Sequence, residues 1–494
     1  MKVLYVCTEL FPFLKTGGLA DVSAGLAPAL QAVGCEVRLL LPAFPAIATQ
    51  ALSTRPIASL PAGPMPWGSA PVLPPASLTL ATLPGLELPV YLVQAPALFD
   101  RPGNPYLGPD GKDWSDNAIR FAALGWAGAT LGQGLDPDWL PDVIHCHDWH
   151  SGLTPAYVRA FATAKQATPA TVFTIHNLAY QGLFAAAEFA QLGLPKSWFD
   201  INGIEFFGKV SFMKAALRYA DRITTVSPTY AREISSDAQG CGLDGLLRER
   251  ANSLSGILNG VDDQIWNPAT DALLPAPYDE DKLQGKTLAK RALQTKFGLE
   301  PRANALVFGA VSRLTAQKGL HLLPQVLADM VQRGGQLALL GQGDVALERA
   351  FVDAASRYPG QVGVRIGYDE VTAHAVIAGA DVILVPSEFE PCGLTQLYGL
   401  RYGTLPLVRR VGGLADTVVD CTLENLDEGS ATGFVFDELS PAGLLSAVRR
   451  AFVLFRRPDD WSAVQQRGMR LRFDWLASAQ HYLAMYQSLR PSAK

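Results

Sequence analysis

Residues 1–41, MKVLYVCTELFPFLKTGGLADVSAGLAPALQAVGCEVRLLL, contain the repeating unit of the fold. A short apolar run, KVLYV, is followed by a glycine pair, a helical segment and a second apolar run, EVRLLL. Such runs, alternating with amphipathic segments, are typical of buried parallel strands joined by helices. The stretch therefore predicts a strand, a helix and a parallel strand at the start of an α/β domain.

The same alternation recurs along the chain. Further apolar runs in the first half are PVYLV (89–93), DVIHCH (142–147), TVFTIH (171–176) and RITTVS (222–227). The second half contains ALVFGAVS (305–312), QLALLG (336–341), QVGVRI (361–366), DVILVPS (381–387), LPLVR (405–409) and GFVFD (433–437). Turn residues in NSLSGILNGVDD, 252–263, interrupt the pattern. We therefore predict two doubly wound α/β domains, residues 1–255 and 256–471.

Three segments depart from this alternation. Residues 42–78 are crowded with Pro and Ala, which cannot pair as central strands, so a surface excursion is expected. Residues 275–299 are interpreted as a charged helical connector into the second domain. Residues 440–490 are helical nearly throughout, with a break at Pro458. This tail is long enough to return to the first domain, and a helix at about 472–494 is expected to complete it.

Composition limits the classes of function. The chain has 494 residues, 49% of them hydrophobic, and a net charge of −5, so a basic nucleic-acid groove is not supported. Its six cysteines form no CxxC pair and are predicted to be reduced thiols. No run approaches the roughly 20 apolar residues that span a bilayer, and no signal or transit peptide is recognisable. The expectation is a bacterial-type cytoplasmic protein that binds neither nucleic acid nor membrane.

The sequence GGLAD occurs twice, at residues 17–21 and 412–416, and each copy opens a predicted helix. A Gly-Gly turn at a helix start leaves backbone N–H groups open to a ligand, which suits an anion. Lys15 lies just upstream of the first pair. The alternative is a tight turn of the kind found in any α/β protein. Neither GxGxxG nor GxxxxGK[ST] is present, so dinucleotide and P-loop sites are not indicated.

Two further motifs follow predicted strands of the second domain. In SRLTAQKG, 312–319, Arg313 and Lys318 supply two cations at a strand-to-helix turn, which suits a diphosphate. In SEFEPCGLTQLYG, 387–399, Glu390 precedes residues 393–395, which open another helix. Because the carboxyl ends of parallel strands meet at one edge of a sheet, we expect these groups to gather there.

Together these motifs resemble the bacterial glycogen synthase and plant starch synthase family. The resemblance rests on KTGGLADV, HCHDWH, IHNLAYQG, ILNGVD, SRLTAQKG and PSEFEPCGLTQLYGLRYGTLPLVRRVGGLADTV, in this order from Lys15 to beyond Val418. It implies a GT-B glycosyltransferase with two Rossmann-like domains facing across a deep cleft. It also implies transfer of glucose from ADP-glucose to the non-reducing end of glycogen or another α-1,4-glucan, with retention of configuration and release of ADP.

The resemblance also implies catalytic roles. Arg313 and Lys318 match the family's pair at the diphosphate, Glu390 matches the acid beside the donor sugar, and His176 matches the histidine against that sugar. Each has a structural alternative: a surface cation at a helix end, a buried salt-bridge carboxylate or a structural imidazole. The implied front-face substitution, in which the departing diphosphate assists the incoming hydroxyl, is adopted as a hypothesis.

Binding roles follow in the same way. The donor-binding residues implied by the resemblance are Lys15, Gly17, Gly18, Tyr368, Gly393, Leu394 and Thr395. The acceptor-side residues are Asp148, Asn259, Glu9 and Tyr106. Tyr368 matches an adenine-stacking tyrosine, with a core aromatic as the alternative. Tyr398 stands where many retaining relatives carry a second Glu, which leaves the ribose contact open.

No metal or other cofactor is expected. The His145, His147 and His150 spacing in HCHDWH is interpreted as alternating between faces of a strand, which disfavours a metal cluster. The DxD strings at 136–138 and 279–281 fall in loop-like sequence. One rival is a phosphorylase that carries pyridoxal phosphate, and another is a catalytically silent glucan- or nucleotide-binding protein. The preference for ADP over UDP rests on the resemblance alone.

Overall fold

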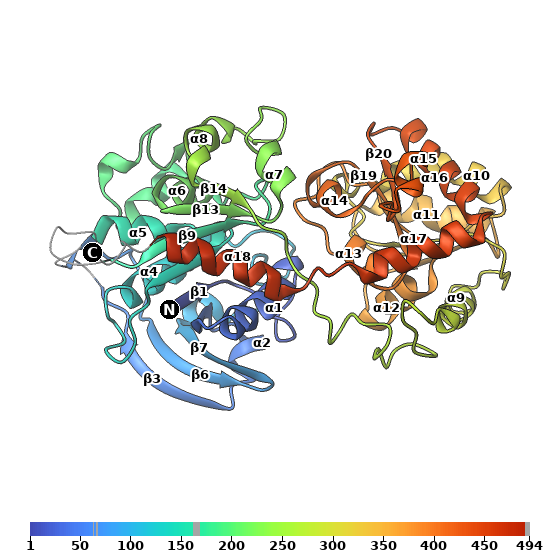
Figure 1. Cartoon of the computed structure of the whole chain (residues 1–494). Coiled ribbons are helices and arrows are strands. Elements are labelled where there is room, and N and C mark those ends of the chain that lie inside the picture. The colour runs from blue at the N-terminus through green and yellow to red at the C-terminus, as the bar shows by residue number, and fades with distance from the viewer. Residues whose placement is uncertain (63, 66–67, 162–167, 490–494) are drawn as a thin grey trace. The chain divides into compact units, whose positions relative to one another are not determined.

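The computed structural model describes residues 1–489 except 63, 66–67 and 162–167. The chain forms two compact units (Figure 1). Unit 1 comprises Met1–Gly260 together with the segment from Trp475 onward, and unit 2 comprises Val261–Asp474. Each unit is built on its own largely parallel sheet.

The sheet of unit 1 has nine strands in the order β14-β13-β9-β8-β1-β2-β7-β6-β3. Strands β14 to β7 are parallel, and β6 and β3 continue the sheet antiparallel. The strands are β1 (Lys2–Val6), β2 (Glu36–Pro42), β3 (Ser53–Ser59), β6 (Ser77–Leu83), β7 (Leu86–Gln94), β8 (Val143–His147), β9 (Ala170–Ile175), β13 (Arg222–Thr225) and β14 (Leu254–Gly256). The predicted strands of the first half are thereby confirmed.

Helices and two small sheets complete unit 1. The helices are α1 (Gly18–Ala32), α2 (Pro45–Ala48), α3 (Pro96–Phe99), α4 (Asn117–Leu131), α5 (Leu153–Phe161), α6 (Phe212–Tyr219), α7 (Pro228–Glu233), α8 (Asp244–Glu249) and α18 (Trp475–Ser488). The small sheets pair β4 (Pro64–Met65) with β5 (Gly68–Ser69), and β10 (Leu183–Ala185) and β11 (Glu205–Phe206) with β12 (Lys209–Ser211).

The Pro-rich segment 42–78 differs from the surface excursion that was predicted. Strand β3, which contains Pro56, pairs with β6 at the outer edge of the large sheet. Proline is tolerated there because an edge strand leaves some of its N–H groups without a ladder partner. The segment therefore extends the sheet.

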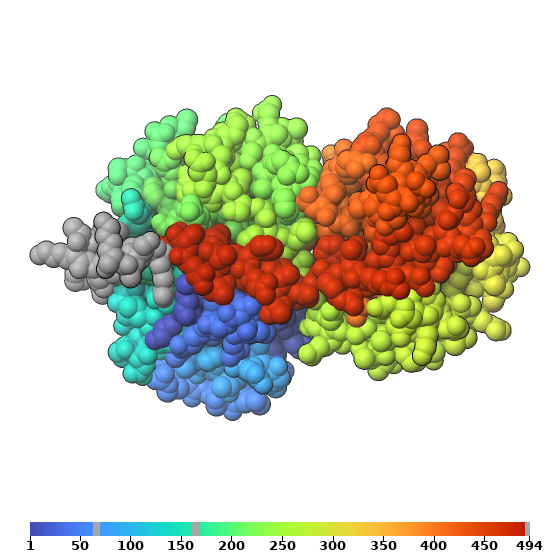
Figure 2. Space-filling view, viewed as in Figure 1, coloured from blue at the N-terminus to red at the C-terminus, as the bar shows by residue number. Residues whose placement is uncertain are grey.

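The main sheet of unit 1 is covered on both faces. Successive side chains of a strand point to opposite faces, so in β1 Leu4 and Val6 enter one hydrophobic cluster while Val3 and Tyr5 enter the other. Helix α18 joins the second cluster, where it packs against α1. Its residues form a strip between the N-terminal residues and the later, green residues of unit 1 (Figure 2).

The contact between α1 and α18 confirms that the C-terminal helix returns to the first unit. It is close because Gly25 of α1 has no side chain: a Cβ there would lie 2.0 Å from Nε1 of Trp475. The Ser478 hydroxyl also donates a hydrogen bond to the Leu258 carbonyl at 2.6 Å.

Unit 2 has a six-stranded parallel sheet in the order β17-β16-β15-β18-β19-β20. Its strands are β15 (Val307–Val311), β16 (Gln336–Gly341), β17 (Val362–Ile366), β18 (Val382–Val385), β19 (Leu405–Arg409) and β20 (Phe434–Phe436). Its helices are α9 (Gln284–Lys296), α10 (Leu323–Gln332), α11 (Val345–Arg357), α12 (Glu370–Gly379), α13 (Thr395–Arg401), α14 (Gly412–Thr417), α15 (Leu423–Asp427), α16 (Pro441–Phe455) and α17 (Pro458–Arg470). The predicted strands of the second half and the break at Pro458 are confirmed.

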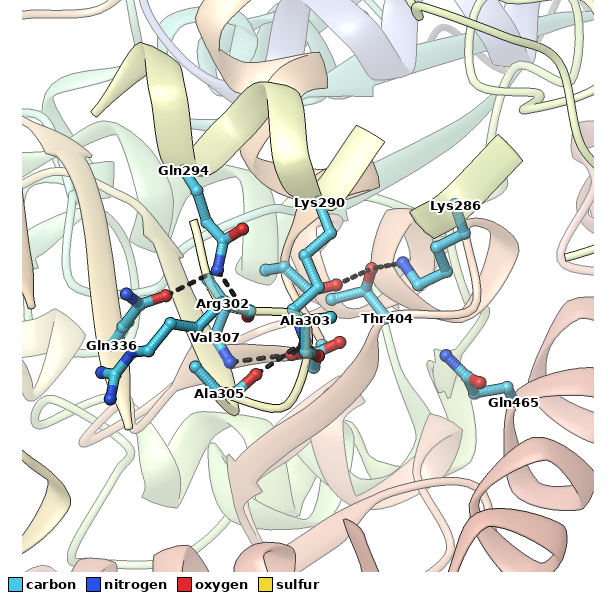
Figure 3. Close-up of polar contacts among 12 residues, drawn as sticks. Lys286, Lys290, Gln294, Arg302, Ala303, Ala305, Val307, Gln336, Thr404 and Gln465 are labelled. Atoms are coloured by element: carbon cyan, nitrogen blue, oxygen red, sulfur yellow. Dashed lines mark hydrogen bonds and ion pairs between the residues drawn. The ribbon is translucent and has the colours of Figure 1, made fainter. Parts of the chain in front are cut away.

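Helix α9 lies in the segment that was interpreted as a charged connector, and three of its polar side chains are buried. Lys286, Lys290 and Gln294 are spaced by four residues, so they share one face of the helix. They point into unit 2, where their polar ends meet hydrogen-bond partners (Figure 3). Nζ of Lys286 donates to the Ala378 carbonyl at 2.9 Å and to the Thr404 hydroxyl at 2.6 Å.

The next lysine of this face, Lys290, pairs with a buried carboxylate. Its Nζ lies 2.7 Å from Oδ2 of Asp381 and donates to the Ala305 carbonyl at 2.6 Å. The same Asp381 oxygen accepts the N–H of Val307 at 2.8 Å. The segment 275–299 is helical and charged, as predicted, and buried charges of α9 anchor the helix to the start of β15.

Candidate active site

Each main sheet has a point at which the strand order reverses. In unit 2 the chain runs from β15 through β16 to β17 on one side, and β18, β19 and β20 lie on the other side of β15. In open α/β sheets, ligands bind beyond the carboxyl ends of the strands at such a switch point. The loops after β15 and β18 are therefore the expected ligand-binding region of unit 2.

These two loops are in direct contact. The N–H of Glu388 donates to the Gln317 carbonyl at 2.8 Å. Gly319 has φ +66°, and a Cβ at this position would lie 1.9 Å from the Pro386 carbonyl oxygen. Only glycine allows this approach, because any other residue would meet both the strained φ and the carbonyl.

Lys318 and Glu390 meet where the two loops touch. Nζ of Lys318 lies 2.6 Å from Oε2 of Glu390, and the Ser387 hydroxyl donates to the same oxygen at 2.9 Å. Glu390 is buried, with 6% of its surface exposed. A buried carboxylate held by a cation and a hydroxyl is fixed in one orientation.

A small cavity of about 50 Å³ lies beside this pair. It is lined by Val311, Ser312, Lys318, Leu320, Leu384, Val385, Pro386, Ser387, Glu390, Gly393, Leu394 and Thr395. The structure thus brings together five of the predicted positions: Lys318, Glu390 and residues 393–395. Ser387 was not singled out from the sequence, although it stands three residues before Glu390.

Two predicted residues of unit 2 lie outside the lining of this cavity. Arg313 is on the loop after β15, and its side chain is exposed. Tyr368 follows β17, is 52% exposed, and donates from its hydroxyl to Oε2 of Glu370 at 2.5 Å. The exposure of Tyr368 excludes the alternative of a core aromatic.

The second glycine pair supports the Glu390 loop. Gly412 has φ +42°, and a Cβ there would lie 1.9 Å from the Glu390 carbonyl oxygen. The N–H of Gly413 donates to that same carbonyl at 3.1 Å. The expectation of an open anion site at residues 412–413 is therefore corrected: this pair lets α14 approach the backbone of Glu390.

Tyr398, which stands where many retaining relatives carry a second Glu, has an aromatic partner. Its ring stacks on Trp266 with centroids 3.8 Å apart and planes 7° from parallel. The other face of Trp266 stacks on His374 at 3.9 Å. The tyrosine therefore forms part of an aromatic stack within unit 2.

Unit 1 has its switch point between β1 and β8. Glu9 follows β1, Asp148 follows β8, and His176 follows β9, so all three lie at the carboxyl edge of the sheet. Asn259 follows β14 at the same edge and is buried. The predicted residues of unit 1 therefore share one edge, as those of unit 2 do.

Glu9 occupies the start of α1. Its carboxylate accepts hydrogen bonds from the Thr16 N–H at 2.6 Å, the Thr16 hydroxyl at 2.5 Å and the Gly17 N–H at 3.2 Å. The Tyr106 hydroxyl donates to it at 2.5 Å. The N–H groups of this loop were expected to be open to a ligand. In this structure the N–H groups of Thr16 and Gly17 donate to the Glu9 carboxylate instead.

The rest of the first glycine loop is more open. Helix α1 begins at Gly18, as predicted, and a Cβ at Gly17 would meet nothing within 4 Å. Lys15 forms an ion pair with Asp21 at 2.9 Å, and its side chain is 28% exposed. A close approach by a ligand at Gly17 is therefore sterically permitted.

Asp148 has an unusual backbone and a perturbed carboxyl. Its φ is +58°, a conformation that few residues other than glycine adopt. Its Oδ1 accepts the N–H groups of His176 at 3.0 Å and Asn177 at 3.4 Å. Burial raises the pKa of the Asp148 carboxyl to about 7. The aspartate therefore ties the ends of β8 and β9 together and changes charge near neutral pH.

His176 is paired with His147. Nδ1 of His147 and Nε2 of His176 are hydrogen-bonded at 3.0 Å. Burial lowers the pKa of His176 to about 3, so its imidazole is neutral at pH 7. A neutral imidazole can form hydrogen bonds but supplies no positive charge.

The histidines of HCHDWH are not distributed as the spacing argument supposed. His145 and His147 are two residues apart in β8, so they lie on the same face, with ring centroids 4.1 Å apart. Both nitrogens of His145 are hydrogen-bonded, Nε2 to the Thr174 hydroxyl and Nδ1 to the Tyr486 hydroxyl, each at 2.7 Å. Among the described residues, no three His, Cys, Asp or Glu side chains are placed to hold a metal.

Comparison with known proteins identifies the family. Residues 2–249 match the family model of the starch synthase catalytic domain, and residues 305–452 match that of glycosyl transferases group 1. Glycogen synthase of Albidiferax ferrireducens is 96% identical over 494 residues, which is 100% of both chains. The chain belongs to the glycogen and starch synthase family. Glycogen synthase of Francisella philomiragia is 53% identical over 492 residues, covering 99% of this chain and 100% of that one.

Solved structures agree with this assignment. The catalytic domain of starch synthase IV from Arabidopsis thaliana, bound to ADP and acarbose, matches with a TM-score of 0.87 at 32% identity over 99% of each chain. Sucrose-phosphate synthase from Thermosynechococcus elongatus shares the fold, with a TM-score of 0.60 at 17% identity. The predicted α/β class and GT-B fold are confirmed, and this synthase-family chain is a glycosyltransferase.

Proposed function

We propose that this synthase transfers glucose from ADP-glucose to the non-reducing end of an α-1,4-glucan, with retention of configuration and release of ADP. The observation that carries the proposal is the Lys318–Glu390 pair, which lies beside a cavity at the switch point of unit 2. The starch synthase relative bound to ADP and acarbose supports the choice of nucleotide and glucan.

The groups around the cavity suit the departure of a diphosphate. As the bond from the glucosyl carbon to the diphosphate breaks, negative charge grows on the leaving oxygen and positive charge grows on the sugar ring. Lys318, with Arg313 from the same loop, stabilises the leaving diphosphate, and the N–H groups of residues 393–395 add hydrogen bonds. The Glu390 carboxylate stabilises the positive charge of the ring.

The transfer itself is proposed as a front-face substitution. The bond from the glucosyl carbon to the incoming hydroxyl oxygen forms on the face from which the diphosphate leaves. The hydroxyl proton passes to a departing diphosphate oxygen. This route needs no carboxylate nucleophile, whereas a double displacement needs a second carboxylate about 5 Å from the first.

Unit 1 is proposed to hold the acceptor and the distal part of the donor. His176 and Asp148 stand at the carboxyl edge of its sheet with Asn259, and Glu9 with Tyr106 lies at the start of α1. Lys15, Gly18 and the open side of Gly17 are proposed to meet the donor phosphate or glucosyl group. No metal or pyridoxal phosphate takes part in this scheme, and we expect the enzyme to act in the bacterial cytoplasm.

In the described part of the chain, no helix is long and apolar enough to cross a membrane.

A comparison of nucleotide-glucose donors is the central test of the proposed function. Purified protein is incubated with glycogen and either ADP-glucose or UDP-glucose, and release of the nucleoside diphosphate is followed. ADP-glucose is expected to be the better donor. An absorbance band of bound pyridoxal phosphate, or no transfer from any nucleotide-glucose, would contradict the proposal.

Variants of the cavity locate the site in the same assay. Lys318→Ala and Glu390→Ala are each expected to lower kcat/KM about a hundredfold, which corresponds to roughly 3 kcal/mol of transition-state stabilisation. Lys282→Ala, which removes an exposed lysine of the same unit, is the matched control. Wild-type turnover in both cavity variants would show that the site is misplaced.

A further inference from the structure

The hydrogen bond between His147 and His176 requires a definite distribution of protons. Burial lowers the pKa of His176 to about 3 and holds the pKa of His147 well below its usual range, so both rings are neutral at pH 7. A neutral imidazole carries one hydrogen, on either Nδ1 or Nε2. One ring must therefore donate and the other accept across the 3.0 Å between Nδ1 of His147 and Nε2 of His176.

The second nitrogen of His147 distinguishes the two arrangements. Nε2 of His147 is buried, and it has no hydrogen-bond partner among the residues that the structure describes. If His176 donated, His147 would carry its hydrogen on this Nε2, as a buried N–H with no acceptor. If His147 donates from Nδ1, its Nε2 is a bare nitrogen instead. Buried N–H groups without an acceptor are rare in proteins, so the arrangement in which His147 donates is favoured.

We propose that His147 is a positioning residue that donates from Nδ1 to Nε2 of His176 and so holds His176 in the tautomer with hydrogen on Nδ1. In this tautomer the half-buried His176 presents an N–H donor at the carboxyl edge of the sheet. A sugar hydroxyl or ring oxygen can accept that hydrogen. The opposite tautomer would present a bare nitrogen, which can only accept.

The orientation of His147 is itself fixed by its neighbours. Its ring stacks on Tyr5 with centroids 4.0 Å apart and planes 22° from parallel. On β8, the ring of His145 lies 4.1 Å away and is held by hydrogen bonds to Thr174 and Tyr486. Because Tyr486 belongs to α18, the C-terminal helix contributes to the support of the His147–His176 pair.

The inference deepens the proposed function, because the role of His176 toward a sugar rests on it. The tautomer, however, can be read without substrate. In protein labelled with 15N in histidine only, two-bond 1H–15N spectra show which nitrogen of each ring carries the hydrogen, and His176→Gln assigns the His176 signals. We expect hydrogen on Nδ1 of His176. Hydrogen on Nε2 in the wild-type protein would overturn the inference, whether or not any variant folds.

Three variants test the role of His147. His147→Phe keeps a ring against Tyr5 but removes the donor, so His176 is expected to become a mixture of tautomers and kcat to fall about tenfold with little change in KM. His147→Asn restores an amide donor near the Nδ1 position and is expected to recover the Nδ1–H signal and most of kcat. His150→Phe removes another buried imidazole of the same motif and should leave the His176 signals unchanged.

An unchanged His176 tautomer in His147→Phe would also overturn the inference. If the wild-type protein showed the expected tautomer but transferred no glucose from any nucleotide-glucose, the proposed function would fail while the positioning role of His147 stood.

Discussion

At the scale of single residues, burial decides the protonation state of the groups at the edge of unit 1. Asp148 and His176 lie next to each other, and burial favours the neutral form of both. For the carboxyl this raises the pKa, and for the imidazole it lowers the pKa. Near neutral pH the aspartate is therefore the member of the pair whose charge responds to pH.

The raised pKa of Asp148 predicts a pH-dependent stability. The folded-state pKa is about 7, whereas an unfolded aspartate titrates near 3.9. Between these values the folded protein binds a proton that the unfolded chain does not, so the free energy of unfolding falls as pH rises. Asp148→Asn removes this effect. We expect the stability of the variant relative to wild type to increase by up to roughly 4 kcal/mol between pH 4 and pH 7.

Urea unfolding at several pH values measures this difference. Asp353→Asn, at an exposed position, is the control and should track the wild type throughout. A constant difference between Asp148→Asn and wild type across this range would show that Asp148 titrates normally.

Ser387 is predicted to act through Glu390. It is fully buried, and its hydroxyl donates to the Glu390 oxygen that also meets Lys318. Ser387→Ala removes one hydrogen bond to a charged group, and kcat/KM for ADP-glucose is expected to fall about tenfold. Initial rates of ADP release provide the measurement, with Ser356→Ala on the exposed face of α11 as control. Equal rates for the two variants would contradict the role.

At the scale of elements, α9 shows how a charged sequence can be a core element. Its polar residues at four-residue spacing satisfy backbone carbonyls and the carboxylate of Asp381 inside unit 2. From the sequence alone, polar residues at this spacing on a buried helix cannot be distinguished from the same residues on a solvent-facing helix. The difference lies in the partners, which come from segments distant along the chain.

Replacing one member of the Lys290–Asp381 ion pair is predicted to lower the free energy of unfolding substantially. Both side chains are only 10% exposed, so solvent does little to screen them. Lys290→Met removes the ion-pair partner of the buried carboxylate and leaves its hydrogen bond from the Val307 N–H, so we expect a loss of about 3–5 kcal/mol in stability. Chemical denaturation checks this, with Arg291→Met on the exposed face of α9 as control. A loss below 1 kcal/mol would mean that water reaches Asp381.

At the scale of the whole molecule, the two units differ in their dependence on the chain end. Unit 1 is completed by α18, which contributes Trp475, Ala479, Tyr482 and Tyr486 to one of its hydrophobic clusters. Unit 2 is formed by one continuous segment, Val261–Asp474. The loss of the C-terminal helix should therefore affect the units unequally.

A chain that ends after Asp474 is predicted to keep unit 2 folded while unit 1 loses cooperative structure. Removing α18 exposes the apolar face of α1 and leaves His145 without its Tyr486 partner. Hydrogen exchange is expected to show protected amides in β15, β16 and β18 and rapid exchange in β1 and β2. Equal protection in both units would show that α18 is dispensable.

Most central strands were predictable because they are short apolar runs buried on both faces, whereas the largely exposed edge strand β3 was not predicted. The helix starts were predictable from their glycine, proline and strand neighbours. The motifs also indicated Lys318, Glu390 and residues 393–395, which the structure brings to one cavity. The roles of the residues that contact them were harder to predict from the sequence. Ser387 and His147 are ordinary residues whose roles depend on a partner reached through space, and no local pattern marks such a partner.

The amino-acid sequence alone determined the α/β alternation, the doubly wound class and the family, because these depend on local periodicity and on uninterrupted motifs. Only the tertiary structure decided that the Glu9 carboxylate accepts hydrogen bonds from the N–H groups of the first glycine loop, that the second glycine pair packs on the Glu390 backbone, and that the lysine face of α9 is buried. Hydrogen bonds and burial join residues far apart in the chain, so they are set by how the strands are ordered in each sheet.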